Sequence, residues 1–394
     1  MVKPRTGLRR LSLQALLALA AAAIASLVLF SIFELFPGLI QPLRLEGIRY
    51  LGMRSRYVSD PELVFVPRRT DFVFRGRTKG DLYAPGLDVD IPWREVEASY
   101  NDLGFRTNSA EPPYRVMLIG DSYVEIGNTD QDTLSERLRA ASGLSTFNLG
   151  RGWYGPYQYV ELFRRFAPEV RPTHAVFCFF AGNDIEDLLE YDGWRRGEGY
   201  YDFDLGEADF LGRYRSALGD AGRFLGTKAH RLRRRLMPSD RDEGRPAHPR
   251  LAEVQLGDET VPIRIRYEDG HATADRLNAS EEWRRLRSLL DEFQDLALEQ
   301  RIRPLVLYIP TKLQVYEPFL LDATGAAKDP VAPNEALSGI EAELDLELID
   351  LLPVFRSAAA AGELLYHPYD THWNGTGRQR AAEHMAARLR ELGS

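Results

Sequence analysis

Short, fully apolar segments alternate with amphipathic helical segments from residue 115 onward, and this alternation restricts the possible folds more than any other feature of the chain. The apolar segments are strand-sized and hydrophobic on both faces, as in a parallel sheet that is covered on both sides. They lie at residues 116–119, 146–149, 175–180, 304–309 and 346–349. The pattern predicts an α/β fold, a three-layer α/β/α sandwich of flavodoxin-like type with a mostly parallel sheet.

Amphipathic helices are expected between these strands, at residues 134–141, 159–170, 280–300 and 376–389. In the helix at 280–300 the large apolar side chains recur at helical spacing, which assigns them, Trp283 included, to the core. The single cysteine, Cys178, lies inside the apolar run at 175–180. We therefore expect a buried, unreactive thiol, and we exclude a disulfide framework and a cysteine-based metal site.

The α/β pattern is interrupted at residues 200–275, which we interpret as an insertion. It contains a strand-like run at 261–265 and a basic cluster formed by Arg231 and residues 233–235. A solvated helix face is the favoured interpretation of this cluster, and a surface facing lipid headgroups or an anionic polymer is the alternative. Residues 38–112 are rich in turn formers, and we expect them to be an accessory segment packed on the α/β domain at 113–394.

An apolar stretch without charged side chains covers residues 11–33, long enough to cross a bilayer as a helix. Four basic residues precede it, Lys3, Arg5, Arg9 and Arg10. Because such residues stay in the cytoplasm, we expect residues 1–37 to form a cytoplasmic stub and a transmembrane anchor, with the remaining chain periplasmic or at the cell surface. A signal peptide cleaved near 23–25 is the alternative, and the continuation of the apolar run to residue 33 disfavours it.

The net charge of −8 argues against nucleic acid as the main partner, because phosphate binding needs a basic footprint. The sequence shows no cluster with metal-ligand spacing. We therefore expect neither a metal nor an organic cofactor.

Polar residues follow the first and third predicted strands, at the edge where open α/β sheets bind ligands. Gly120-Asp121-Ser122 follows the first strand, Asn183 follows the third, and Asp370-Thr371-His372 precedes the last helix. Each piece alone is ordinary turn or cap chemistry. Together they supply what a serine nucleophile needs, with Ser122 attacking, His372 as base, Asp370 orienting the ring, and the Asn183 amide as an oxyanion donor.

This ordered set of blocks resembles the SGNH/GDSL hydrolase superfamily, over residues 113–200 and 275–394. The resemblance implies that Ser122 and His372, with Asp370, are catalytic, and that the Ser122 amide, a glycine amide of the second block and the Asn183 side chain form the oxyanion hole. Aligned without gaps, that glycine falls on Trp153, and Gly152 stands just before it. We take Gly152 as the donor and Trp153 as the alternative, because any residue except proline can donate its amide.

The ending Asp370-Thr371-His372-Trp373-Asn374 looks like the branch that includes alginate O-acetyltransferase-like proteins, and residues 309–312 and 365–366 also look like it. The resemblance implies a serine esterase acting on acyl esters, in particular acetyl esters, with a polysaccharide as candidate carrier. The alternative is an O-acyltransferase that moves an acetyl group onto an extracytoplasmic glycan, together with a membrane-bound acyl-donor partner. An alternative of another class is a non-catalytic glycan-binding or scaffold protein.

Aromatic residues at 153–159, 191–201 and 373 are candidates for stacking on sugar rings, and packing in the core is the default interpretation of such residues.

Overall fold

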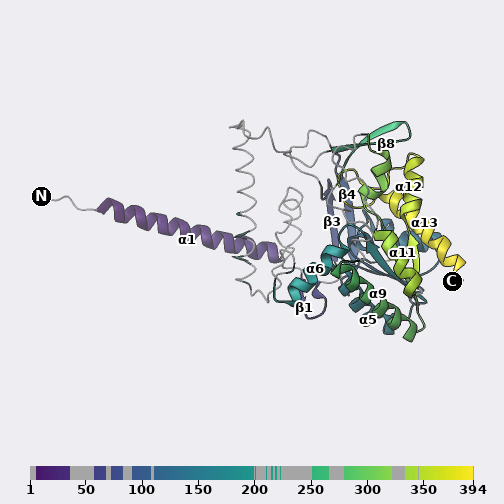
Figure 1. Ribbon diagram of the computed structural model, residues 1–394. Helices are drawn as coiled ribbons and strands as arrows, with labels where there is room; N and C mark the ends of the chain where they lie inside the picture. The colour runs from purple at the N-terminus through teal and green to yellow at the C-terminus, as the bar shows by residue number, and fades with distance from the viewer. Residues whose placement is uncertain are drawn as a thin grey trace. The chain divides into compact units, whose positions relative to one another are not determined.

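The computed structural model of the 394-residue chain describes the folded body and a long N-terminal helix (Figure 1). It describes residues 6–35, 57–67, 72–82, 91–107, 111–198, 200, 210, 214, 215, 218, 219, 222, 251–265, 279–321, 333–344 and 346–393. The chain divides into two compact units, one formed by residues 1–59 with 203–240 and one formed by residues 60–202 with 241–394.

The second unit is organised around a five-stranded sheet in the order β11-β10-β7-β5-β6. All four neighbouring pairs run parallel. The strands are β5 (Val116–Gly120), β6 (Thr146–Gly150), β7 (His174–Phe180), β10 (Arg303–Ile309) and β11 (Glu347–Asp350). Every residue of β5, β6 and β7 is buried, which explains why these strands are mostly apolar, with Thr146, Asn148 and His174 as buried polar exceptions.

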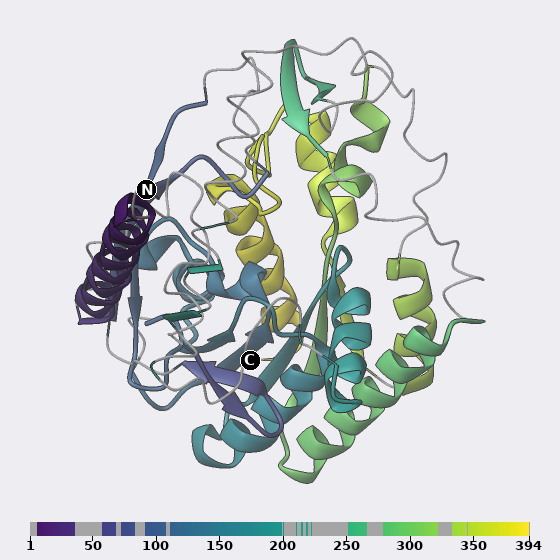
Figure 2. The ribbon, with the colours of Figure 1, turned by 90° about the vertical axis from the view of Figure 1, so that its left-hand side faces the viewer.

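Helices cover both faces of this sheet, and in Figure 2 α13 (yellow) and α9 (green) lie on opposite sides of the strands. On one side α13 packs against α4 and α12, and on the other α9 packs against α5, α6 and α11. The helices are α3 (Ser122–Glu125), α4 (Leu134–Ser142), α5 (Pro156–Val170), α6 (Asp184–Arg195), α9 (Glu281–Glu299), α10 (Lys312–Tyr316), α11 (Pro333–Leu344), α12 (Leu352–Ala360) and α13 (Gly375–Glu391). The predicted fold class, an α/β sandwich with a parallel sheet, is confirmed.

Local sequence explains where most of these helices begin. Ser280 caps α9 by accepting the Trp283 N–H, and the apolar side chains of α9 are buried, as expected. Helix α5 begins at Pro156, three residues before the predicted start, because proline is well suited to the first helical position. The prediction had no element for the acidic helix α6 or for α10, α11 and α12. Cys178 is fully buried, as predicted.

The part of residues 60–112 that the structure describes is mainly strand. It contains the end of β1 (Tyr57–Asp60), then β2 (Val64–Pro67), and an antiparallel pair formed by β3 (Phe72–Thr78) and β4 (Arg94–Tyr100). Residues at the ends of β3 and β4 contact the loop that carries Asp370 and His372. Gly80 is the clearest case, because it has a positive φ of 104° and a Cβ there would lie 2.1 Å from the Tyr369 carbonyl oxygen.

Within the expected insertion, β8 (Leu251–Leu256) and β9 (Glu259–Arg264) form an antiparallel hairpin. This hairpin contains most of the strand-like run expected at 261–265. The basic cluster at Arg231 and residues 233–235 lies outside the described residues.

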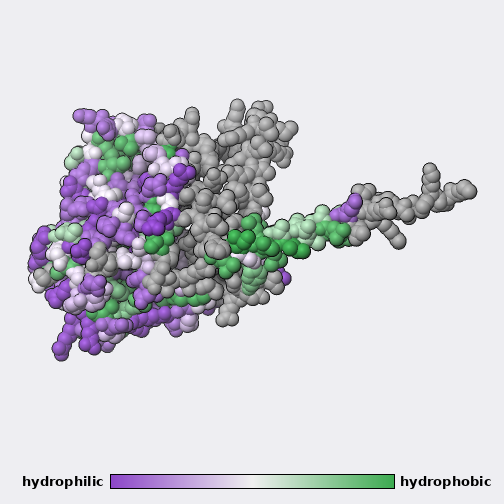
Figure 3. Space-filling view, turned by 180° about the vertical axis from the view of Figure 1, so that it is seen from behind, coloured by the Kyte–Doolittle hydropathy of each residue, from purple (hydrophilic) through white to green (hydrophobic). Residues whose placement is uncertain are grey.

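The first unit contains helix α1 (Thr6–Leu35). Within it, residues Gln14–Ile32 have a mean hydropathy of 2.6, and none of the most apolar window is buried by the rest of the protein. Figure 3 shows the hydrophobic colour along most of this helix. By length and composition, α1 is therefore a candidate for crossing a membrane or for serving as a signal sequence.

Candidate active site

Ser122 stands at the start of α3, directly after the carboxyl end of β5. The preceding Asp121 caps this short helix by accepting the Tyr123 N–H at 2.8 Å. Gly150, at the end of the neighbouring strand β6, passes so close to α3 that a Cβ would lie 2.4 Å from the Glu125 amide nitrogen. This close approach requires glycine, and it fixes the helix that carries Ser122 against the sheet edge.

The structure brings Ser122, His372 and Asp370 together in one hydrogen-bonded chain. His372 Nε2 lies 2.8 Å from Ser122 Oγ, and His372 Nδ1 lies 2.7 Å from Asp370 Oδ1. Since an ionised carboxylate can only accept, Nδ1 carries the proton donated to Asp370, and Nε2 accepts the Ser122 hydroxyl. The Asp121 carboxylate is 3.4 Å from Ser122 Oγ, so it is the weaker of the two acceptors.

Electrostatics prepare His372 to receive a proton. Burial alone lowers the pKa of His372, but the hydrogen bond to Asp370 and the Asp370 charge outweigh it, so the pKa is raised above 6.5. Burial raises the pKa of Asp370, but the His372 hydrogen bond, the His372 charge and the Arg94 charge hold it well below its usual range. Asp121 behaves differently, because burial raises its pKa to about 6.

Three distant residues fix the loop that carries Asp370 and His372. The guanidinium of Arg94, on β4, forms an ion pair with Asp370. Asp81 accepts the Thr371 N–H at 2.7 Å and its hydroxyl at 2.8 Å. The Lys312 ammonium donates to the carbonyl oxygens of His367 and Asp370 at 2.8 and 2.6 Å. Sequence reasoning did not find the roles of Arg94 and Asp81, because neither residue lies in a recognisable motif.

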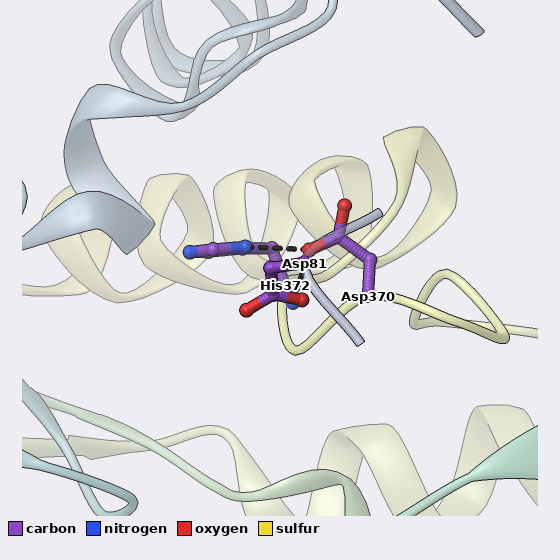
Figure 4. Close-up of side chains that lie close together, drawn as sticks. All are labelled: Asp81, Asp370 and His372. Atoms are coloured by element: carbon purple, nitrogen blue, oxygen red, sulfur yellow. Dashed lines mark hydrogen bonds and ion pairs between the residues drawn. The ribbon is translucent and has the colours of Figure 1, made fainter. Parts of the chain in front are cut away.

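Asp81, Asp370 and His372 lie close enough to share a cation (Figure 4). Both ring nitrogens of His372 are already engaged, one by Asp370 and one by Ser122. The Asp81 carboxylate is engaged as well, because it accepts the Thr371 N–H. A metal would have to displace the hydrogen bonds of the triad, so the group fits a proton-transfer site better than a metal site.

Gly152, the expected second oxyanion donor, has its amide engaged elsewhere. Its N–H donates to Glu125 Oε2 at 2.6 Å. The other Glu125 oxygen accepts from the Tyr100 hydroxyl at 3.0 Å and from Arg151 at 3.2 Å. Gly152 still lies beside the nucleophile, because a Cβ there would be 3.6 Å from Ser122 Cβ. Gly152 as oxyanion donor stays a prediction, and this hydrogen bond counts against it.

Trp153, the alternative donor, has a backbone conformation that glycine adopts more readily than any other residue. Its φ is +66°, in the left-handed region that favours glycine. The turn is closed by the Tyr154 N–H, which donates to the Arg151 carbonyl at 3.1 Å, and the Tyr200 hydroxyl donates to the Trp153 carbonyl at 2.6 Å. Turn geometry is thus kept although the sequence departs from the resemblance at this position.

Asn183 lies at the expected place, after β7 and before α6. The side chains of Asn183 and Ser122 both hydrogen-bond the Asp121 carboxylate and lower its pKa, so both lie against the same group. The Asn183 amide also donates to Asp187 Oδ2 at 2.9 Å. Asp187 is fully buried, and burial raises its pKa well above 3.8, which favours the neutral acid. Sequence reasoning did not single out Asp187.

Four of the aromatic residues proposed for sugar stacking belong to the core. Trp373, Tyr154, Tyr159 and Tyr200 are each exposed by 1% or less. A sugar ring cannot reach these faces, so the stacking prediction is wrong for them. Core packing, the default interpretation of large aromatic residues, applies to these four side chains.

Comparison with known proteins supports the resemblance to the SGNH superfamily. Residues 267–394 match the family model described as the SGNH hydrolase-like domain of acetyltransferase AlgX. The resemblance to the SGNH superfamily, with its alginate O-acetyltransferase-like branch, is thereby confirmed. A search of curated proteins gives no match.

Two solved structures are similar to this chain at low identity. A psychrotrophic esterase, EstA from Pseudoalteromonas sp., inhibited by monoethylphosphonate, has a TM-score of 0.34 and 9% identity, over 71% of this chain and 97% of that one. A protein described as lipolytic, of the G-D-S-L family from Desulfitobacterium hafniense DCB-2, has a TM-score of 0.35 and 12% identity, over 69% and 98%. At these scores the two structures add nothing to the functional argument.

The raised pKa of His372 predicts the pH dependence of any reaction in which it acts as base. Neutral imidazole accepts the Ser122 proton, so kcat/KM should fall about tenfold per pH unit below a pKa that lies above 6.5. Replacing Arg94 by Met removes a cation beside the Asp370–His372 pair and should move this acidic limb to higher pH, whereas Arg94→Lys should keep it. A limb at or below pH 6.5 in the unmodified protein would contradict the prediction.

The Glu125–Arg151 pair predicts a large effect on stability. The side chains of Glu125 and Arg151 are only 11% and 4% exposed. Glu125→Ala leaves a buried cation and should lower the free energy of unfolding by about 3–5 kcal/mol in denaturant titration. The matched control is Glu383→Ala, whose ion pair with Arg380 is 45% and 42% exposed and should change stability by less than about 1 kcal/mol. Equal losses in the two variants would rule out the buried pair as a stabilising contact.

Proposed function

We propose that this protein is an extracytoplasmic, membrane-anchored serine esterase that acts on acyl esters, in particular acetyl esters, with a polysaccharide as their carrier. The observation that carries the proposal is the chain Ser122–His372–Asp370, with contacts of 2.8 and 2.7 Å at the carboxyl edge of a parallel sheet. The family match over residues 267–394 supports it, because that segment holds both His372 and Asp370.

In the proposed reaction, His372 Nε2 takes the proton as Ser122 Oγ attacks the ester carbonyl. The resulting imidazolium is stabilised by the Asp370 carboxylate, which Arg94 keeps ionised. The tetrahedral intermediate collapses to an acyl-enzyme as His372 returns the proton to the leaving alcohol. Water, deprotonated by the same imidazole, then releases the acid. The Ser122 amide and the Asn183 side chain are the proposed oxyanion donors, with the third from Gly152 or Trp153.

The location is proposed from the N-terminus of the chain. Helix α1 is long and apolar enough to span a bilayer, and its basic N-terminal flank favours a cytoplasmic start. An uncleaved anchor would place the catalytic unit outside the cytoplasm, where esters of secreted glycans are found.

A fluorophosphonate probe tests the nucleophile directly. The unmodified protein should be labelled, and Ser122→Ala should abolish the label and reduce kcat by roughly 10⁴- to 10⁶-fold, because the covalent step is lost. Ser142→Ala, which changes a serine at the end of α4, should be labelled like the unmodified protein. A folded protein that resists the probe would instead favour the non-catalytic glycan-binding or scaffold alternative.

O-acyl transfer is the second candidate function, and the match to a family named for an acetyltransferase favours it. The same triad serves both reactions, since only the group that accepts the acyl chain differs. With p-nitrophenyl acetate as donor, an esterase should release acetate to water even when an acetyl-free oligosaccharide is added. If acetylated oligosaccharide dominates at millimolar acceptor, the protein is a transferase, and a membrane-bound acyl-donor partner is then expected.

A further inference from the structure

Phe210 and Tyr214 contact the proposed anchor helix, which belongs to the same compact unit. The ring of Phe30 lies edge-on to Phe210 and Tyr214, with centroid distances of 5.4 and 5.6 Å. The Tyr214 hydroxyl forms a hydrogen bond with Ser26 Oγ, which itself donates to the Ala23 carbonyl at 2.8 Å. Two side chains that are far away in the sequence therefore pack against the second half of α1, and Ser26 and Tyr214 are separated by 188 residues.

The positions of Ser26 and Phe30 on α1 give the depth of this contact. The apolar span ends at Ile32, six residues after Ser26 and two after Phe30. At 1.5 Å per residue, Ser26 lies about 9 Å and Phe30 about 3 Å inside the outer end of the span. Side chains that touch both residues must therefore enter the outer part of the bilayer if α1 crosses it. Interfacial helices bury their apolar face to roughly 5–10 Å, the same depth.

The chemistry of the segment suits this depth. Phe210, Tyr214 and Leu218 each have a helical backbone conformation and are spaced by four residues, the interval at which side chains of an α-helix lie one above the other. Tyr214 is only 9% exposed because it lies against α1, whereas Phe210 and Leu218 remain 37% and 46% exposed. Tyrosine is enriched at the membrane interface because its ring is apolar and its hydroxyl polar. Pairing that hydroxyl with Ser26 also satisfies a polar group that would otherwise face hydrocarbon.

We propose that Phe210, Tyr214 and Leu218 form a second membrane contact, an apolar helical face that enters the outer leaflet beside α1. The proposal rests on the membrane anchor of the proposed function. The occupant is the lipid bilayer, because the face is continuous with a helix that has the length and hydropathy of a membrane span. The chain would then meet the membrane at two points, which restricts rotation of the extracytoplasmic part about α1.

Spin-label accessibility tests the proposal in the full chain reconstituted into vesicles of phosphatidylcholine and phosphatidylglycerol at 3:1. Labels are placed at Leu218→Cys and, as matched control, at Leu298→Cys, a leucine of α9 that is 57% exposed, both in a Cys178→Ala background. Oxygen concentrates in lipid and a nickel chelate in water. The ratio of oxygen to nickel collision rates should be at least several-fold higher at 218 than at 298.

The outcomes separate this proposal from the anchor on which it rests. Release of the protein by a carbonate wash would overturn the anchor, and the second contact with it. If the protein stays in the membrane but the label at 218 is as accessible to nickel as that at 298, only the second contact is wrong. A label at 218 that neither reagent reaches would show that protein covers the face, in the form of this chain or a second copy, and would likewise overturn it.

Discussion

The Asp370 carboxylate is the group on which the rest of the site depends. It lies in a buried position where a lone charge would be costly, and it is held ionised by the His372 hydrogen bond and the Arg94 cation. Because it is ionised, it fixes the Nδ1–H tautomer of His372, and that tautomer leaves Nε2 to accept from Ser122. The Arg94 charge adds to the hydrogen bond and the charge of His372 in keeping Asp370 ionised, the form that orients the ring in this way.

The Asp370 carboxylate and its loop are held partly by residues in and beside β3 and β4, which precede the sheet in the sequence. Arg94 lies on β4, and the segment after β3 carries Gly80 and Asp81, which contact the loop of residues 369–371. On the opposite side, the ammonium of Lys312 holds two carbonyls of that loop. His372 is therefore positioned by elements that come before and after the core of the domain in sequence, and not by its own loop alone.

Carboxylates also hold both expected oxyanion donors other than the serine amide. Glu125 accepts the Gly152 N–H, and Asp187 accepts from the Asn183 amide. The two carboxylates differ in environment, because Glu125 is paired with Arg151 whereas burial and neighbouring acids favour a neutral Asp187. Trp153, the residue after Gly152, has a left-handed backbone conformation that favours glycine. Because a backbone amide has a single N–H, Gly152 would have to give up its hydrogen bond to Glu125 before it could donate to an oxyanion.

The sequence by itself determined the sheet and the three catalytic candidates. Apolar strands are a local pattern, Ser122 and Asn183 follow strands at the edge where such sheets bind ligands, and Asp370 and His372 stand just before the last helix. Only the tertiary structure decided which groups hold them. Arg94 and Asp370 are 276 residues apart, and Gly152 is engaged by a glutamate that looks like any other helix residue. Such contacts depend on the packing of distant elements, so no periodicity or spacing along the chain records them.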